Sequence, residues 1–267
     1  MDNQTFEKKM RELEYFHSLR LLPGTHTVIR ADGRSFSKFT SSSFDKPFDL
    51  KFHELMVETA KALLSELDGI YAYTESDEIS VLFPPDWDLF DRSLEKIVSI
   101  SASIASATFT RAAQTAVSFD SRICSAANKS QVVDYFLWRQ ADAARCALNG
   151  WSYWMLRKNG ETGENAAVIL EKQSVAFKNE LLFQNGINFN ELPAWQRRGT
   201  GVYWEKYDKP GYNPIEGKEV VAVRRRLKVD EDLPMKEEYK EFIYQFLNVG
   251  DYALRISFQI RWLLMNS

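Results

Sequence analysis

The chain has 267 residues, 45% of them hydrophobic, and a formal net charge of −3. This hydrophobic content supports a sizeable core and excludes disorder for the chain as a whole. The slightly acidic balance argues against a protein that coats nucleic acid through its overall charge, although a local basic patch is enough to bind RNA.

Cysteine usage and the N-terminus indicate where the protein works. Cys124 and Cys146 are too few for a disulfide framework and have no zinc-type spacing with histidine. The N-terminus lacks a signal-peptide pattern, and Arg111 interrupts the small-residue run 99–117, so no membrane span is predicted. We therefore expect a soluble, cytoplasmic protein.

In chain order, the first predicted elements are a charged helix at residues 6–20 and a buried strand at residues 27–31. The helix has apolar residues at helical spacing, namely Phe6, Met10, Leu13 and Phe16. The strand stops at Asp32-Gly33, where small polar residues follow. Glycine lets the backbone approach a ligand closely, and successive N–H groups there can face an anion. This loop is a candidate metal–phosphate site.

An acidic hairpin at residues 70–83 follows a predicted helix at residues 52–67. Two runs rich in aromatic and β-branched residues flank Glu75, Ser76, Asp77 and Glu78. Like charges this close repel one another unless a cation lies among them, although a solvated acidic turn is the alternative. Asp32 and Asp77 on adjacent strands could share two Mg²⁺ ions over a nucleotide triphosphate.

The order of the elements predicts the fold class. A long helix at residues 94–117 and a strand at residues 119–124 complete the series strand, helix, strand, strand, helix, strand. This is the order of a ferredoxin-like α+β unit, the shape of a polymerase-type palm. We expect an antiparallel sheet with packed helices, and residues 1–130 as the catalytic palm.

Residues 131–267 are expected to form a C-terminal helix-and-hairpin region packed on the palm. Helices are predicted at 132–158, 170–184 and 235–247, with a hairpin between 201–204 and 218–229. Basic residues gather in this region: Arg197, Arg198, Arg224, Arg225, Arg226 and Lys228. The triple-arginine run is either a solvated edge that prevents aggregation or a contact to an RNA backbone.

Five motifs, in order along the chain, resemble the tRNA-His guanylyltransferase family. They are Arg30-Ala31-Asp32-Gly33-Arg34-Ser35-Phe36, Ser76-Asp77-Glu78, Trp138-Arg139-Gln140-Ala141-Asp142, Lys178-Asn179-Glu180-Leu181-Leu182-Phe183, and Leu192-Pro193 followed by Arg197-Arg198-Gly199-Thr200. Members of that family add nucleotides in the 3′-to-5′ direction at a tRNA 5′ end, using a palm related to ordinary polymerases. The resemblance implies a nucleotidyltransferase with tRNA and nucleoside triphosphates as substrates, and a homo-oligomer, either dimer or tetramer.

The resemblance also implies roles for individual residues. Asp32, Asp77 and the Gly33 carbonyl would bind two Mg²⁺ ions, with Glu78 as a supporting acid. Catalysis would further involve Arg30 and Lys46, which fall on positions that serve 5′ activation by ATP or GTP. The nucleotide would be bound by Asp32, Gly33, Arg34, Ser35, Phe36, Ser37, Ser76, Asp77, Lys96 and Arg122, of which Lys96 is supported only by spacing and a nearby Phe-x-Arg. Contacts to tRNA would come from Lys178, Arg197 and Arg198.

One departure from the family pattern bears on the substrate. Eukaryotic members carry His-Ile-Asn-Asn-Leu-Tyr-Asn after the Arg-Gln-Ala-Asp motif, whereas residues 143–150 here read Ala-Ala-Arg-Cys-Ala-Leu-Asn-Gly. This resembles the tRNA-His guanylyltransferase-like branch, whose implied work is templated repair of truncated tRNA 5′ ends. Two other functions stay open: a nucleotide cyclase on a related palm, which would consume NTP without RNA, and a non-catalytic RNA-binding module, which would expose aromatic residues on the central strands.

Overall fold

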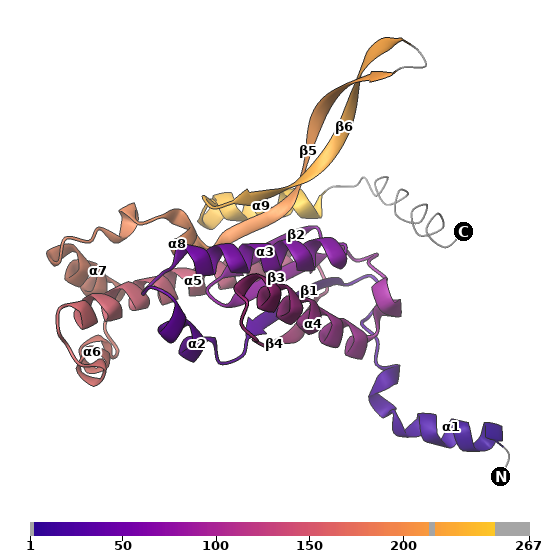
Figure 1. The fold of residues 1–267 in the computed structure, drawn as a ribbon, viewed down its shortest axis with the longest axis horizontal. Helices are drawn as coiled ribbons and strands as arrows, with labels where there is room; N and C mark the ends of the chain where they lie inside the picture. The colour runs from indigo at the N-terminus through magenta and orange to yellow at the C-terminus, as the bar shows by residue number, and fades with distance from the viewer. Residues whose placement is uncertain (1–2, 214–216, 249–267) are drawn as a thin grey trace.

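The structure is a computed structural model that describes residues 3–213 and 217–248 (Figure 1). Its centre is a six-stranded sheet in which every neighbouring pair is antiparallel. Across the sheet the strands are β4 (Phe119–Ala126), β1 (His26–Gly33), β3 (Glu78–Phe83), β2 (Tyr71–Glu75), β5 (Thr200–Asn213) and β6 (Lys218–Asp230). The predicted α+β class with an antiparallel sheet is confirmed.

Helices lie on both faces of this sheet. They are α1 (Asn3–Leu13), α2 (Phe36–Ser43), α3 (Leu50–Glu66), α4 (Leu94–Ala113), α5 (Lys129–Lys158), α6 (Gly163–Leu170), α7 (Val175–Gln184), α8 (Ala194–Arg198) and α9 (Lys236–Leu247), with short 3₁₀ helices at Tyr15–Ser18, Leu89–Arg92 and Phe189–Glu191. Because side chains alternate along a strand, each central strand contributes to two cores.

The two cores explain why the central strands are apolar on both sides. Ile29 and Val81 pack with α3 and α4 on one face. Val28, Tyr71 and Leu82 pack with α5 and α9 on the other face. Burial on both faces makes β2 and β3 nearly continuous apolar runs, and the polar residues are left at the strand ends where the candidate site lies.

The C-terminal half of the chain completes the sheet. Strand β5 pairs with β2, from Thr200 opposite Thr74 to Tyr203 opposite Tyr71. The hairpin predicted in this region is present, and its first strand is longer than expected because it continues well past the body of the protein. Figure 1 shows this part of β5 and β6 projecting as an arm, while α1 projects at the opposite end.

Three helices differ between the prediction and the structure. The leading helix ends at Leu13 and its apolar residues, including Phe6, are exposed. The predicted helix at 170–184 is present but begins later, at Val175. Helix α6 ends at Leu170, and Ser174 accepts a hydrogen bond from the N–H of Phe177 and begins α7. Helix α2 was not predicted, since its serines are weak helix formers and only the packing of Phe36 and Phe39 reveals it.

Candidate active site

The acidic turn, Glu75–Glu78, lies at one end of the two central strands. Glu75 pairs with Glu78, so Ser76 and Asp77 form a two-residue connection, and Ser76 has a φ of 49°. Asp32 pairs with Glu78 on the neighbouring strand, and the Gly33 N–H donates to the Asp77 carbonyl at 3.0 Å. The structure therefore brings Asp32 and Asp77 to the same end of adjacent strands.

The two aspartates repel one another in the protein without a cation. Burial raises the pKa of Asp77 most, and the charge of Asp32 raises it further, while the Ser76 hydroxyl and Lys46 lower it. Among residues 3–213 and 217–248, no three Asp, Glu, His or Cys side chains cluster in a way that could hold a metal by themselves. Mg²⁺ suits such a site, because it retains water and takes phosphate oxygens besides one or two carboxylates.

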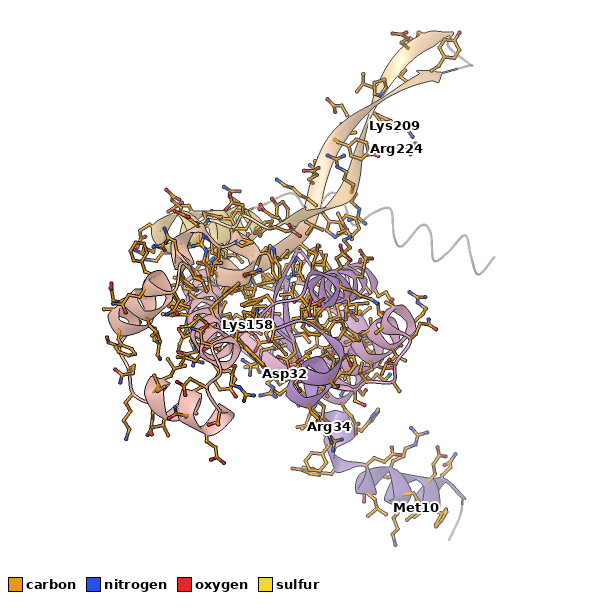
Figure 2. All side chains as sticks on the ribbon, turned by 60° about the vertical axis from the view of Figure 1, so that its left-hand side comes forward. Met10, Asp32, Arg34, Lys158, Lys209 and Arg224 are labelled. Atoms are coloured by element: carbon orange, nitrogen blue, oxygen red, sulfur yellow. The ribbon has the colours of Figure 1, made fainter. Side chains whose placement is uncertain are left out.

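The loop after Asp32 is shaped by a buried phenylalanine. A Cβ atom on Gly33 would lie 2.5 Å from the Phe36 ring, so only glycine fits there. Phe36 in turn packs on Phe109 and Phe119. Ser35 has a φ of 61° and precedes the first turn of α2, whose N–H groups favour anions. Arg34 is exposed beside this turn, and Figure 2 shows it close to Asp32.

A cavity of about 350 Å³ adjoins the acidic turn. Its wall on α5 is made of small residues at helical spacing, and aromatic rings enclose other sides: Ala143, Ala147 and Gly150, with Phe44, Phe48, Trp154 and Trp195. The ring of His53 stacks on Trp195 with centroids 4.2 Å apart. This size and mixture of apolar walls with a few polar groups is typical of a small-molecule site.

Lys46 lies in this cavity rather than in solvent. Its Nζ donates to the Thr40 hydroxyl at 2.7 Å. Burial lowers the pKa of Lys46, although the carboxylates of Asp77 and Asp49 act to raise it. The lysine is therefore a partly buried cation within electrostatic reach of the acidic turn.

Arg139 is a site residue whose role sequence reasoning missed. It is 5% exposed on α5 and donates to Glu78 Oε1 at 2.7 Å, Glu75 Oε1 at 3.0 Å and Asp142 Oδ2 at 3.1 Å. Burial raises the pKa of Glu75 to about 8, with the charge of Glu78 as the next cause. The motif around Arg139 marked the residue, but only the packing of α5 on the sheet shows which acids it contacts.

Of the remaining predicted cations, Arg30 and Arg122 lie at the site and Lys96 lies away from it. Arg30 Nε lies 3.5 Å from Glu78 Oε2. Arg122 on β4 pairs with Arg30 on the neighbouring strand β1, so it also lies at the site. Its Nη2 donates to Asp120 Oδ1 at 2.9 Å. Lys96 does not lie at the site: it is exposed in the first turn of α4. Helix α4 contacts the start of β4 through Ser101, which bonds Ser121, and through Ser106, which accepts from the N–H of Phe119. These serines come five and ten residues after Lys96, about 8 and 15 Å along the helix.

The predicted tRNA-contact residues all have partners within the chain. Lys178 Nζ donates to Asn149 Oδ1 at 2.7 Å. Arg197 Nε donates to the carbonyl of Leu192 at 2.9 Å. Arg198 donates to the carbonyl of Leu233 and to Asp232 Oδ1, each at 3.0 Å, which ties α8 to the segment after β6.

In the part of the chain that the structure describes, no helix is long and apolar enough to cross a membrane.

Comparisons with known proteins place these features in a family. The family model described as tRNAHis guanylyltransferase matches residues 7–133, and that of the Thg1 C terminal domain matches residues 130–242. The tRNA(His) guanylyltransferase of Schizosaccharomyces pombe is 32% identical over 85% of this chain and 94% of its own length. That of Neurospora crassa is 32% identical over 90% of this chain and 89% of its own length.

Solved structures show the same fold. A bacterial tRNA(His) guanylyltransferase (Thg1)-like protein in complex with ATP is 27% identical, with a TM-score of 0.73 over 91% of this chain and 99% of that chain. A bacterial protein of the same name in complex with GTP gives a TM-score of 0.70 over 92% of this chain and 100% of that chain, again at 27% identity.

Proposed function

This chain belongs to the tRNAHis guanylyltransferase family and is a nucleotidyltransferase, and we propose that it adds nucleotides in the 3′-to-5′ direction to the 5′ end of tRNA, with Mg²⁺, after activation by ATP or GTP. The observation that carries this proposal is the pair Asp32 and Asp77, held at the ends of adjacent strands beside a cavity large enough for a nucleobase.

The metal would be held by Asp32, Asp77 and the Gly33 carbonyl. Bound Mg²⁺ would lower the pKa of the attacking hydroxyl and neutralise charge that develops on the phosphates. The role of Glu78 is different, because its carboxylate is already engaged by Arg139 and Arg30. Glu78 would therefore support the position of the acidic turn rather than bind the metal directly.

The activating nucleotide would lie across the acidic turn and the cavity. Its triphosphate would face the loop 33–37, where a helix begins, together with Arg122, and its base would enter between the aromatic walls. The ATP and GTP complexes of the bacterial proteins support a site of this kind. Lys46 would contact phosphate oxygens during activation, since its cation lies in the cavity near Asp77.

The reaction would have two phosphoryl-transfer steps. In the first, a 5′-phosphate oxygen of the tRNA attacks the α-phosphorus of ATP or GTP and expels pyrophosphate, which leaves a 5′–5′ nucleotidyl end. In the second, the 3′-hydroxyl of an incoming NTP attacks the 5′ phosphorus of the tRNA and expels the nucleoside monophosphate. Both steps depend on positioning and on charge stabilisation, so no side-chain nucleophile is required.

The small residues of α5 favour the repair branch of the family. Ala143, Ala147 and Gly150 belong to the stretch that departs from the eukaryotic motif, and they line the cavity in front of the acidic turn. We propose templated repair of 5′-truncated tRNA as the main reaction, with the protein acting in the cytoplasm as a homo-oligomer. Lys178 and Arg197 would contact the tRNA, and Arg198 would hold the structure around them.

A single comparison of substrates tests this proposal. The protein is incubated with Mg²⁺, ATP and all four NTPs, together with either a tRNA lacking its first 5′ nucleotide or full-length tRNA-His, and the 5′ ends are sequenced. We expect addition to the truncated tRNA, directed by the opposite strand. Addition to neither RNA would contradict the proposal, and NTP consumption without RNA would identify a cyclase instead.

A further inference from the structure

The arm, residues 203–213 and 218–228, carries charge unevenly on its two faces. Paired residues of antiparallel strands point to the same face, so the register of β5 with β6 assigns each charged residue to a face. One face holds five basic residues and one acid: Lys209, Lys218, Arg224, Arg226 and Lys228, with Glu205. The opposite face holds two of each: Lys206 and Arg225, with Asp208 and Glu219. We call the first of these the basic face.

Ring contacts confirm this division of the arm. Arg226 lies over the Tyr207 ring at 5.3 Å, and both belong to the basic face. Arg225 lies over the Trp204 ring at 4.3 Å, and both belong to the opposite face. Figure 2 shows Lys209 and Arg224 on the same side of the arm, well away from Asp32.

Protection of a sheet edge does not account for the basic face. Strand β6 is an edge strand, and lysines or arginines on such a strand hinder pairing with other chains. That protection works with charge on either face, whereas here the excess lies on one face only. Glu205 accepts a hydrogen bond from Arg226 at 2.6 Å, so the single acid of this face bonds one of its five cations. The remaining excess of positive charge on the face suits an anionic partner.

We propose that the basic face binds the phosphate backbone of the tRNA body while the 5′ end lies at the acidic turn. Arg224, Arg226 and Lys228 follow one another on β6 at about 6.8 Å, and they form a row rather than a pocket, as an extended polyanion requires. Tyr207, the partner of Arg224, comes seven residues after Thr200 beside the site, about 24 Å along the strand. An A-form RNA helix rises less per base pair than the about 3.4 Å of B-form DNA, so that distance corresponds to more than about seven base pairs of tRNA.

The proposal rests on tRNA as the substrate, and a face-specific pair of variants tests it. Lys209→Ala with Arg224→Ala removes two cations from the basic face, and Lys206→Ala with Arg225→Ala removes two from the opposite face of the same arm. The dissociation constant for a tRNA transcript lacking its first 5′ nucleotide is measured from about 0.05 to about 0.4 M KCl, the range in which phosphate contacts weaken steeply. All four residues are exposed, so both variants should fold.

We expect the basic-face variant to lower the log–log salt slope by about two, at about 0.9 per lost phosphate contact. The same slope corresponds to a loss of affinity of about eightfold per phosphate contact at about 0.1 M salt. Losing two contacts should therefore weaken tRNA binding by about 60-fold. The opposite-face variant should keep the wild-type slope. Equal slopes for both variants and wild type, or equal losses in both variants, would overturn the proposal.

Two further outcomes separate this inference from the proposed activity. An unchanged slope with a changed oligomeric mass in the basic-face variant would assign the face to a second copy of the chain, and it would overturn RNA binding there. Wild-type addition to truncated tRNA is measured separately. If that activity is present and the slopes are equal, only the role of the basic face fails; if it is absent, the proposed activity itself fails.

Discussion

The acidic turn and the arm both concentrate charge, but they place it in opposite environments. The carboxylates of Glu75 and Glu78 are buried, and Arg139 bonds both of them at 3.0 Å or less. On the arm, Arg224 and Lys209 are exposed and stand on a two-stranded ribbon outside the body. A buried charge interacts strongly with each neighbour, whereas an exposed one is screened by water and salt.

This difference decides how each region responds to substitution. At the turn, removing one partner leaves another buried charge without compensation, so folding and chemistry both change. On the arm, a single charge contributes little to stability and acts mainly on the affinity for a charged partner. Matched substitutions in the two regions therefore measure the contrast directly.

The largest expected effect is the loss of activity in Asp32→Ala and Asp77→Ala. Each removes a proposed metal ligand, and a loss of several kcal/mol of transition-state stabilisation lowers the rate by about 10³-fold or more. The free energy of unfolding should stay the same or rise slightly, because two like charges no longer repel. Asp208→Ala on the arm is the control. Turnover close to wild type in either variant would refute the metal assignment.

The second prediction concerns Arg139. Arg139→Met leaves Glu75 and Glu78 buried without their shared cation, and we expect unfolding to become easier by about 3 to 5 kcal/mol. Arg225→Met on the arm, where the guanidinium only stacks on the Trp204 ring, should cost less than about 1 kcal/mol. Urea denaturation of the two variants tests this. Similar midpoints would show that Arg139 contributes no more than a surface cation.

The sequence could predict those features of the site that have local signals, and it could not predict those that depend on long-range contacts. The strand ends at Asp32 and Asp77 were visible because runs of apolar residues, glycine and acids are local signals. The contacts of Arg139 were not, since they join residues more than sixty positions apart, and only the packing of α5 on the sheet creates them. For the same reason, spacing and a nearby Phe-x-Arg placed Lys96 among the nucleotide-binding residues, while α4 carries it away from the site.

On the arm, the strands could be predicted from the sequence, but the face on which each charge lies could not. The choice between a solvated edge and an RNA contact depended on which face each residue occupies. That choice needs the register of the β5–β6 ladder, which runs from Gly201 opposite Asp230 to Asn213 opposite Lys218. A shift of one residue would move every cation of β6 to the other face.

The smallest expected effect is a pH dependence of stability that Glu75 imposes. Its pKa in the folded protein is about 8, above the ordinary value of 4.5, so the folded state holds this proton more tightly than the unfolded state does. Stability from this group is therefore fully present below about pH 4.5 and falls as the pH rises to about 8. We expect a total change of about 1 to 2 kcal/mol, smaller than about 1.36 kcal/mol per pKa unit would give, because relaxation and water penetration reduce the cost of a buried charge.

Glu75→Gln isolates this contribution. The amide is neutral at every pH, so the variant should lose less stability than wild type between about pH 5 and pH 8, where the difference in proton binding operates. Glu219→Gln removes an exposed carboxylate from the arm and should leave the wild-type curve unchanged, since a surface charge screened by water and salt contributes little to stability. The measurement is the free energy of unfolding in urea at several pH values. Parallel curves for wild type and Glu75→Gln would mean that Arg139 keeps Glu75 ionised throughout, and the buried turn would then be a fully paired ion cluster.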